Sequence, residues 1–254
     1  MKIHTVKQHI IAGEQQEEIK KAIKDWRMWN HATRQAFIDS INVYTSPAWE
    51  ELRAGKFTAS TASKFLADAR IKDAGMGESA KALAHQIMAE MTGWRPARNP
   101  YMEYASVRRG LVFEDVARKM AEKELGQKIT EVGFVEKNTM YGCSPDGLIM
   151  NGDKIEAVIE IKTPEPTAFY EQLMNCAKKE YQQQMQFAMW CCDCSRAYFV
   201  LYCPEVNNNV YILKYTRGMA WQAKLDKRAS EMANYIQSVQ EQVRKGEFNI
   251  PTLE

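Results

Sequence analysis

The sequence lacks the features that mark several large classes of protein. It has no apolar run of about 18 residues and its N-terminus leads into a polar stretch, so we expect neither a membrane-spanning helix nor a signal peptide and interpret the protein as intracellular, in the cytoplasm. The four histidines all lie before residue 86 and show no zinc-ligand spacing. This distribution argues against a zinc hydrolase and against a Ser-His-Asp triad.

Cysteine is absent from the first half of the chain, and all six cysteines fall between residues 143 and 203. In an intracellular protein we expect them to be free thiols. A metal or iron–sulfur cluster is the alternative for one group of them, but the spacing fits no known pattern of such sites. That group consists of Cys191, Cys192, Cys194 and Cys203.

The composition is that of an ordinary globular protein. With 254 residues, 45% hydrophobic and 26% charged, the chain is long enough for one large domain and too short for two full ones. The net charge of +2 is too small to indicate a nucleic-acid partner, although residues 51–110 hold ten lysine and arginine residues against six acidic ones. That local excess permits DNA binding without demonstrating it.

Two acids and a lysine fall on or beside one predicted β-hairpin. Asn151-Gly152-Asp153 is a turn signal between two apolar runs, which predicts a hairpin over residues 147–162. In its second strand the side chains alternate. We expect Ile155, Ala157, Ile159 and Ile161 to face a core, with the opposite face shared by Glu156, Glu160 and Lys162.

The register of this hairpin determines how Asp146 lies relative to Glu160. If the loop is residues 151–153, Met150 pairs with Lys154, and Asp146 falls opposite Val158, diagonal to Glu160 and on its face. A two-residue loop would reverse that parity, so the register stays conditional on the loop length.

Neighbouring carboxylates repel each other unless a cation lies between them or one takes up a proton. Asp146, Glu160 and the backbone carbonyl of Ile161 offer the oxygen ligands that magnesium or manganese prefers. Lys162 beside them would orient a metal-bound water or stabilise charge on an attacked phosphate. An ordinary surface hairpin is the alternative interpretation of the same residues.

Pro145-Asp146 and Glu160-Ile161-Lys162 resemble the motif of the PD-(D/E)xK nuclease superfamily. The sequence is similar in finer detail to the lambda exonuclease, or YqaJ-type viral recombinase, family. Three further segments carry that similarity in the family's order: Trp49-Glu50-Glu51-Leu52-Arg53 with Ser60, Arg109-Gly110-Leu111-Val112-Phe113-Glu114, and Tyr181-Gln182-Gln183-Gln184-Met185-Gln186. The resemblance covers about residues 47 to 215.

The resemblance implies an α/β fold with a restriction-endonuclease-like core, in which helices flank a central mixed β-sheet. We expect a helical extension at residues 1–46, the nuclease core at 47–215 and a C-terminal helix at 216–254. The implied activity is magnesium-dependent digestion of linear double-stranded DNA from 5′ to 3′, leaving a 3′ single strand for recombination or single-strand annealing. The implied partners are DNA ends, a single-strand annealing protein and further copies of the chain in a ring-shaped homotrimer, in a bacterial host of a phage or prophage.

The resemblance also assigns roles to individual residues. Two Mg²⁺ ions, for which Mn²⁺ can substitute, would be held by Glu114, Asp146, Glu160 and the Ile161 carbonyl. Lys162 would orient the attacking water, with Gln184 and Tyr181 beside it. The 5′-phosphate of the DNA end would be held by Arg53, Ser60 and Ser144. The alternatives are a helix-capping Ser60, a surface Arg53, and ordinary helix-surface roles for Glu114, Tyr181 and Gln184.

Apolar periodicity predicts helices at residues 17–29, 78–91, 107–125 and 217–245, with a short helix at 61–69. Strands are expected at 130–136, 139–143, 197–202 and 209–215. The first helix lies outside the resemblance, and packing, DNA contact and partner binding are all open for it. The last packs on the domain or on a neighbouring subunit. In the loop 94–104, Arg95 and Arg98 are either DNA-backbone contacts or solvated residues.

Two rival functions are also compatible with the sequence. A PD-(D/E)xK endonuclease would share the metal site and cut internally, so activity on closed circular DNA would identify it. A non-catalytic scaffold that binds DNA ends would be expected to have lost an acid or the lysine, and Asp146, Glu160 and Lys162 are all present.

Overall fold

The computed structural model describes residues 1–11, 13, 15–70, 75–95 and 104–246. Its centre is a four-stranded mixed sheet in the order β10 (Val210–Thr216), β9 (Arg196–Tyr202), β8 (Lys154–Lys162) and β7 (Gly147–Asn151). Strands β8 and β9 are parallel, whereas the two outer pairs are antiparallel. The expected central mixed sheet is thus confirmed.

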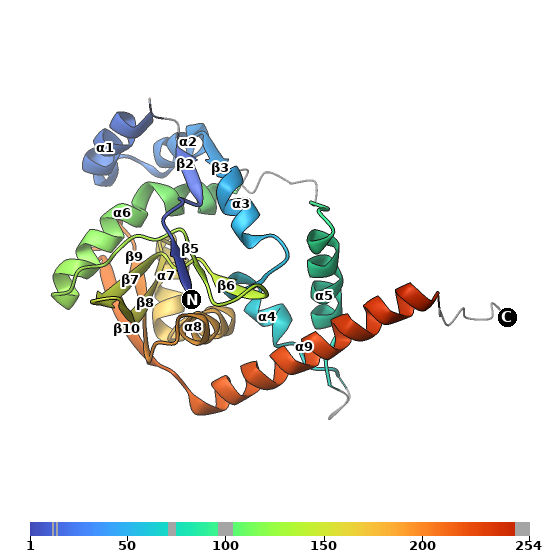
Figure 1. Cartoon of the computed structure of the whole chain (residues 1–254). Coiled ribbons are helices and arrows are strands. Elements are labelled where there is room, and N and C mark those ends of the chain that lie inside the picture. The colour runs from blue at the N-terminus through green and yellow to red at the C-terminus, as the bar shows by residue number, and fades with distance from the viewer. Residues whose placement is uncertain (12, 14, 71–74, 96–103, 247–254) are drawn as a thin grey trace.

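Helices cover both faces of this sheet, with α6 (Ala105–Leu125) on one side and α8 (Lys179–Cys192) on the other (Figure 1). Helices α7 (Pro166–Met174) and α8 also connect the parallel strands β8 and β9. The sheet residues divide between two buried clusters: Val158 packs with α8, and Ile159 packs with α6. A sheet covered on both faces buries its strands almost completely.

The hairpin of β7 and β8 differs from the expected register. Its loop has two residues, because Asn151 pairs with Lys154, and Gly152 adopts a positive φ of 57°. A β-bulge then leaves Glu156 as an extra residue between the pairs Met150–Ile155 and Ile149–Ala157.

The bulge has two consequences. Val158 pairs with Leu148, so Asp146 does not lie opposite Val158, where a three-residue loop would have placed it. The backbone N–H of Asp146 instead donates to the carbonyl of Ile159 at 3.0 Å. The bulge also reverses the alternation, because an extra residue changes which face the following side chains occupy. Ile155 therefore lies in the cluster of Val158 and not, as expected, with Ile159.

A second four-stranded sheet lies beside the first. Its order is β1 (Lys2–His4), β5 (Phe134–Glu136), β6 (Tyr141–Cys143) and β4 (Phe57–Thr58), with β4 and β6 parallel. The strands β5 and β6 are shorter than the predicted 130–136 and 139–143. Because β6 runs directly into the segment before β7, this sheet brings the chain to Asp146.

The described part of residues 1–46 contains three short strands as well as helices. Strands β2 (His9–Ile11) and β3 (Val43–Thr45) pair with each other. The chain between them forms α1 (Gln15–Asp25), the 3₁₀ turn η1 (Trp26–Met28) and α2 (His31–Ser40). The Asn30 side chain accepts a hydrogen bond from the backbone of Thr33 and caps α2. Trp26 is 1% exposed and packs edge-on against Phe113 of α6 at 4.8 Å between ring centres, so this segment shares the core.

The remaining helices follow the sequence pattern closely. Helix α3 (Pro47–Arg53) starts after the capping residue Ser46, and α5 (Glu78–Met91) has the predicted bounds. The predicted helix 61–69 is shorter, comprising the 3₁₀ turn η2 (Ala59–Thr61) and α4 (Ala62–Phe65). None of the helices in the described ranges is both long and apolar enough to cross a membrane.

The C-terminal helix α9 (Met219–Lys245) packs on α5 and α8 through buried residues, and Figure 1 shows it continuing past α5. The buried apolar residues are Leu225, Met232 and Ile236. Arg228 is 3% exposed and donates to the carbonyls of Phe65 and Ala67, at 2.8 and 2.7 Å. These contacts attach the first two thirds of α9 to the domain, while Val243 near its end is 60% exposed.

Candidate active site

A cleft of about 870 Å³ opens at the end of β8, between the central sheet, α6, α8 and the N-terminal segment. All ten residues predicted as site residues line it. They are Arg53, Ser60, Glu114, Ser144, Asp146, Glu160, Ile161, Lys162, Tyr181 and Gln184. The fold therefore brings together residues that lie as far as 131 positions apart in the chain.

Asp146 lies immediately before β7 and is held against the backbone of β8. Its Oδ2 accepts a hydrogen bond from the N–H of Ile161 at 2.6 Å. Burial raises the pKa of Asp146, and the charge of Lys162 opposes that rise. The hydrogen bond fixes the carboxylate next to Glu160 and the Ile161 carbonyl on the same strand.

Glu160 is only 5% exposed and receives two side-chain donors. Lys162 Nζ donates to its Oε1 at 2.5 Å, and Gln184 Nε2 donates to its Oε2 at 2.7 Å. Burial nevertheless raises the pKa of Glu160 to about 7, because the protein interior disfavours the charged form. Gln184 thus acts on Glu160 directly, from the helix that crosses this face of the sheet.

Lys162 is held between carboxylates and an aromatic ring. Burial acts to lower its pKa, but the charges of Glu160 and Asp146 outweigh burial and raise the pKa above its usual value. Its ammonium group lies 5.1 Å from the centre of the Tyr181 ring, within the range of a cation–π contact. Lys162 is therefore a permanently protonated group in the cleft.

Glu114 projects from α6 toward the same carboxylates. Burial, and then the charge of Asp146, raise its pKa to about 8. Arg118, one turn later on the helix, donates from Nη2 to Glu114 Oε1 at 2.5 Å and from Nε to the backbone carbonyl of Asp146 at 3.1 Å. Arg118 is not among the predicted site residues, although its spacing of four residues from Glu114 on a helix was a usable signal.

Among the described residues, no three histidine, cysteine or acidic side chains are arranged so that they could hold a metal ion without side-chain movement. Glu114 contacts Arg118, and Glu160 contacts Lys162 and Gln184. The donor chemistry still fits a hard divalent cation, because Glu114, Asp146 and Glu160 bring three carboxylates to the cleft beside the Ile161 carbonyl. Burial disfavours the charged form of all three acids, and a bound cation would remove that penalty.

A second group of polar side chains lines the cleft around Arg53, at the end of α3. Arg53 Nη2 donates to Thr58 Oγ1 and to Ser60 Oγ, both at 3.0 Å, and its guanidinium lies 4.4 Å from the Trp49 ring centre. Trp49 Nε1 in turn donates to Ser144 Oγ at 3.1 Å. Thr58 and Thr61 form the capping box of the adjacent turn, so Ser60 does not serve as its cap.

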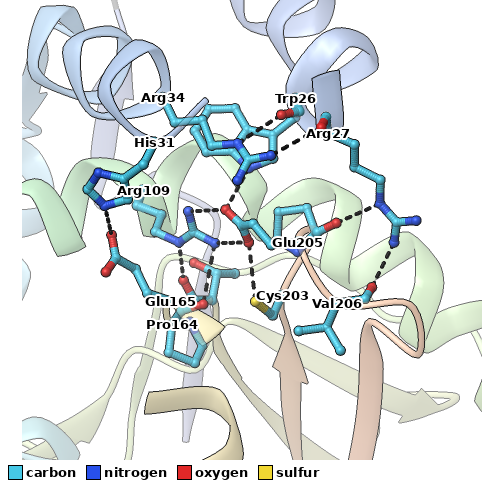
Figure 2. A network of polar contacts seen from close by, with 12 residues as sticks. Trp26, Arg27, His31, Arg34, Arg109, Pro164, Glu165, Cys203, Glu205 and Val206 are labelled. Carbon is cyan, nitrogen blue, oxygen red and sulfur yellow. Dashed lines mark hydrogen bonds and ion pairs between the residues drawn. The ribbon is translucent and has the colours of Figure 1, made fainter. Parts of the chain in front are cut away.

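The N-terminal segment, whose role the sequence left open, forms another side of the cleft. Its lining residues are Gln8, His9, Trp26, His31, Arg34, Gln35 and Ile38. Figure 2 shows how this segment is attached: Trp26 Nε1 and Arg109 both donate to Glu205, in the loop between β9 and β10. Arg27 donates to the carbonyls of Pro204 and Val206, both at 2.7 Å.

Arg109, the arginine of the R-G-x-x-x-E motif, lies at the centre of this network (Figure 2). It donates to both carboxylate oxygens of Glu205, at 2.9 and 2.7 Å, and to the carbonyl of Thr163 at 2.8 Å. Thr163 directly follows Lys162. The same guanidinium therefore connects α6, the N-terminal segment and the end of the strand that carries Glu160 and Lys162.

The six cysteines are free. Cys143 Sγ lies 3.5 Å from Cys192 Sγ, whereas Cys203 Sγ donates to Glu205 at 3.2 Å. Burial raises the pKa values of Cys194 and Cys203 to about 12, so both remain neutral thiols near pH 7. Of the two loop arginines, Arg95 pairs with Glu51 at 3.0 Å, and Arg98 lies outside the described residues.

Comparison with known proteins gives a consistent result. The family model of the YqaJ-like viral recombinase domain matches residues 48–195. An alkaline exonuclease, LHK-Exo from Laribacter hongkongensis, is 26% identical with a TM-score of 0.59, over 79% of this chain and 99% of that one. Its complex with dAMP compares at 25% identity and a TM-score of 0.62, with the same coverage.

A phage-related exonuclease from Haemophilus somnus shares the fold at 16% identity, with a TM-score of 0.60 over 76% of this chain and 98% of that one. The search of curated proteins found no match to this sequence. The similarity in fold thus extends over nearly the whole length of both solved exonucleases.

Proposed function

The chain belongs to the YqaJ-like viral recombinase family, and on that premise we propose that it is a metal-dependent exonuclease that digests one strand of double-stranded DNA from 5′ to 3′. The observation that carries the proposal is that one cleft holds both a carboxylate–lysine group and a separate Arg53 group suited to an anion. The first group supplies phosphodiester hydrolysis. The second selects a terminal phosphate and so confines cutting to an end.

In this proposal Glu114, Asp146, Glu160 and the Ile161 carbonyl hold two Mg²⁺ ions, for which Mn²⁺ can substitute. Such ions polarise a phosphate and lower the pKa of a bound water when they are present. Lys162, held by Glu160 at 2.5 Å, keeps its proton and orients the attacking water or stabilises charge on the phosphate. Gln184 positions the Glu160 carboxylate, and Tyr181 packs against the Lys162 ammonium.

The Arg53 group gives the reaction its direction. Thr58, Ser60 and Ser144 each offer a hydroxyl that can rotate to donate to a phosphate oxygen. The guanidinium of Arg53 supplies the charge, and its packing on Trp49 limits its movement. The relative solved in complex with dAMP, a deoxynucleoside monophosphate, supports a phosphate subsite in this family.

The proposed product, partner and cellular context are those implied by the family. The product would be a 3′ single strand for homologous recombination or single-strand annealing, with an annealing protein as partner, in the cytoplasm of a bacterial host of a phage or prophage. A ring-shaped homotrimer would enclose the duplex. The family name, a viral recombinase domain, supports this context.

The test is digestion of linear duplex DNA, labelled at either end and carrying 5′-phosphate or 5′-hydroxyl, in the presence of Mg²⁺. We expect loss of the 5′-phosphorylated strand from its end, abolished by Asp146→Asn and Lys162→Met. Lys154→Met is the matched control, because Lys154 is an exposed lysine at the other end of the same strand. Arg53→Gln should reduce the preference for 5′-phosphate while leaving slow cutting.

Two outcomes would replace this proposal. Cutting of closed circular DNA at a rate similar to linear DNA would indicate an endonuclease with the same metal site. Protection of DNA ends in Mg²⁺ with no cutting by the unmodified chain would indicate a non-catalytic end-binding scaffold.

A further inference from the structure

Strand β2, which lies outside the family domain at residues 48–195, brings His9 into the cleft. His9 pairs with Thr45 of β3, and the carbonyl of its neighbour Gln8 accepts a hydrogen bond from Ser46 at 2.9 Å. Ser46 caps α3, the helix that carries Trp49 and Arg53. The position of His9 relative to the Arg53 group is therefore set by backbone contacts on both sides.

The ring of His9 lies against the Arg53 group. Its centre is 6.3 Å from the Trp49 ring centre, and Trp49 also contacts Arg53 and Ser144. Burial, and then the charge of Arg53, lower the pKa of His9 to about 4. The ring is consequently neutral near pH 7 and carries a single N–H.

The surroundings indicate which ring nitrogen carries that hydrogen. Nδ1 of His9 is buried and has no hydrogen-bond partner among the described residues. A buried N–H without an acceptor is rare in folded proteins, whereas an unused lone pair is better tolerated. We therefore place the ring hydrogen on Nε2. Nε2 is then the ring nitrogen that can donate a hydrogen bond to a ligand in the cleft.

We propose that His9 binds the 5′-terminal phosphate, donating a hydrogen bond from Nε2 alongside Arg53 and Ser60. This inference rests on the proposed function and makes the N-terminal segment part of the DNA-end site. A neutral donor suits the position, because Arg53 already supplies the positive charge and a second cation beside it would be repelled. The Glu205 network in Figure 2 holds the helices between β2 and β3 on the domain, so the donor is fixed in place before DNA arrives.

Two substitutions separate hydrogen bonding from packing. His9→Phe keeps a ring against Trp49 and removes the donor, whereas His9→Gln loses the ring and keeps an N–H donor of similar reach. We expect His9→Phe to reduce the preference for 5′-phosphate over 5′-hydroxyl ends by about 10- to 150-fold, the effect of one hydrogen bond to a charged group. His9→Gln should restore most of that preference. His85→Phe is the matched control, because His85 bonds Tyr235 and is absent from the cleft lining.

Binding is measured separately from cutting, by NMR of the full chain labelled with ¹⁵N-histidine, in EDTA, with a 5′-phosphorylated or a 5′-hydroxyl duplex. The ¹⁵N signals of His9 should shift with the phosphorylated duplex alone, and Arg53→Gln should remove the response. If Arg53→Gln lowers the end preference while His9→Phe does not and the His9 signals stay still, the role of His9 is refuted and the proposed function stands. If neither variant changes the end preference, the phosphate subsite itself is refuted. Loss of preference in both His9→Phe and His9→Gln would reduce His9 to a packing residue.

Discussion

Replacing Arg109 by methionine should destabilise the whole domain, because it breaks the one buried ion pair that Glu205 makes among the described residues. Arg109 is 6% exposed and donates to both oxygens of Glu205 and to the carbonyls of Thr163 and Pro164. Burial acts to raise the pKa of Glu205, but the hydrogen bonds from Arg109 outweigh burial and hold that pKa at about 2. Without Arg109, the carboxylate keeps the donors of Trp26 and Cys203, the other two that bond it within the described part of the chain.

Removing one partner of a buried pair costs about 3–5 kcal/mol of unfolding free energy, since the other charge stays buried. For a chain of this length that corresponds to a melting temperature lower by roughly 6–20 °C. Urea denaturation of Arg109→Met, Glu205→Leu and the double variant measures the free energies. The double variant should lose less than the sum of the two single variants, because it leaves no unpaired charge.

Lys119→Met is the control for Arg109→Met on the same helix. Lys119 pairs with Asp115 at 2.7 Å, but both side chains are more than 60% exposed, so its loss should leave the free energy of unfolding nearly unchanged. A loss below about 1 kcal/mol for Arg109→Met, or strict additivity in the double variant, would refute the reasoning. In Arg109→Met we also expect faster limited proteolysis within residues 1–46, whose helices depend on the same network.

Three further predictions concern the cleft. Burial raises the pKa of Glu160 to about 7 and that of Glu114 to about 8, so protons compete with Mg²⁺ for these carboxylates below those pH values. A fixed Mg²⁺ concentration should therefore raise the melting temperature more at pH 8.5 than at pH 6. Equal gains in melting temperature at the two pH values would contradict this prediction. Arg118→Met removes the hydrogen bond that positions the Glu114 carboxylate, so it should raise the Mg²⁺ concentration for half-maximal cutting by about 10- to 100-fold. An unchanged Mg²⁺ titration would exclude a positioning role for Arg118. The pKa of His9 in the folded chain, about 4, lies below its ordinary 6.5, so between these pH values only the unfolded chain gains the proton. The free energy of unfolding should therefore fall as the pH is lowered, by at most about 1.4 kcal/mol per pH unit. The stability of His9→Gln relative to the unmodified chain should rise as the pH is lowered from 7.5 to 4.5, and a constant difference would contradict this prediction.

Several features of the fold were predictable because they depend on short stretches of sequence. The alternation before Lys162 and the Asn151-Gly152-Asp153 turn indicated the hairpin, and apolar periodicity predicted α5 with its observed bounds. Family motifs then selected the ten cleft residues from among many similar side chains. Gln184, for example, is one of four glutamines within residues 182–186, and only the fold shows that its amide bonds Glu160.

Other features depended on contacts distant in the sequence. The bulge at Glu156 is not marked by glycine or proline, yet it determines which face Ile155 occupies. In the sequence, Arg118 does not differ from other charged residues on the same helix. Its contacts with Glu114 and the Asp146 carbonyl are seen only in the folded chain. Residues 1–46 carry no motif, so their place at the cleft could not be foreseen.

The sequence by itself determined the chemistry available to this protein: two acids and a lysine around one hairpin, a third acid on a helix, and an arginine with nearby hydroxyls. Local periodicity and residue type suffice for that, because both act over a few residues. Only the tertiary structure decided that these groups share one cleft with His9 and that Glu205 ties the N-terminal segment to α6. Such juxtapositions follow from burying both faces of the central sheet at once, a constraint that acts across the whole chain.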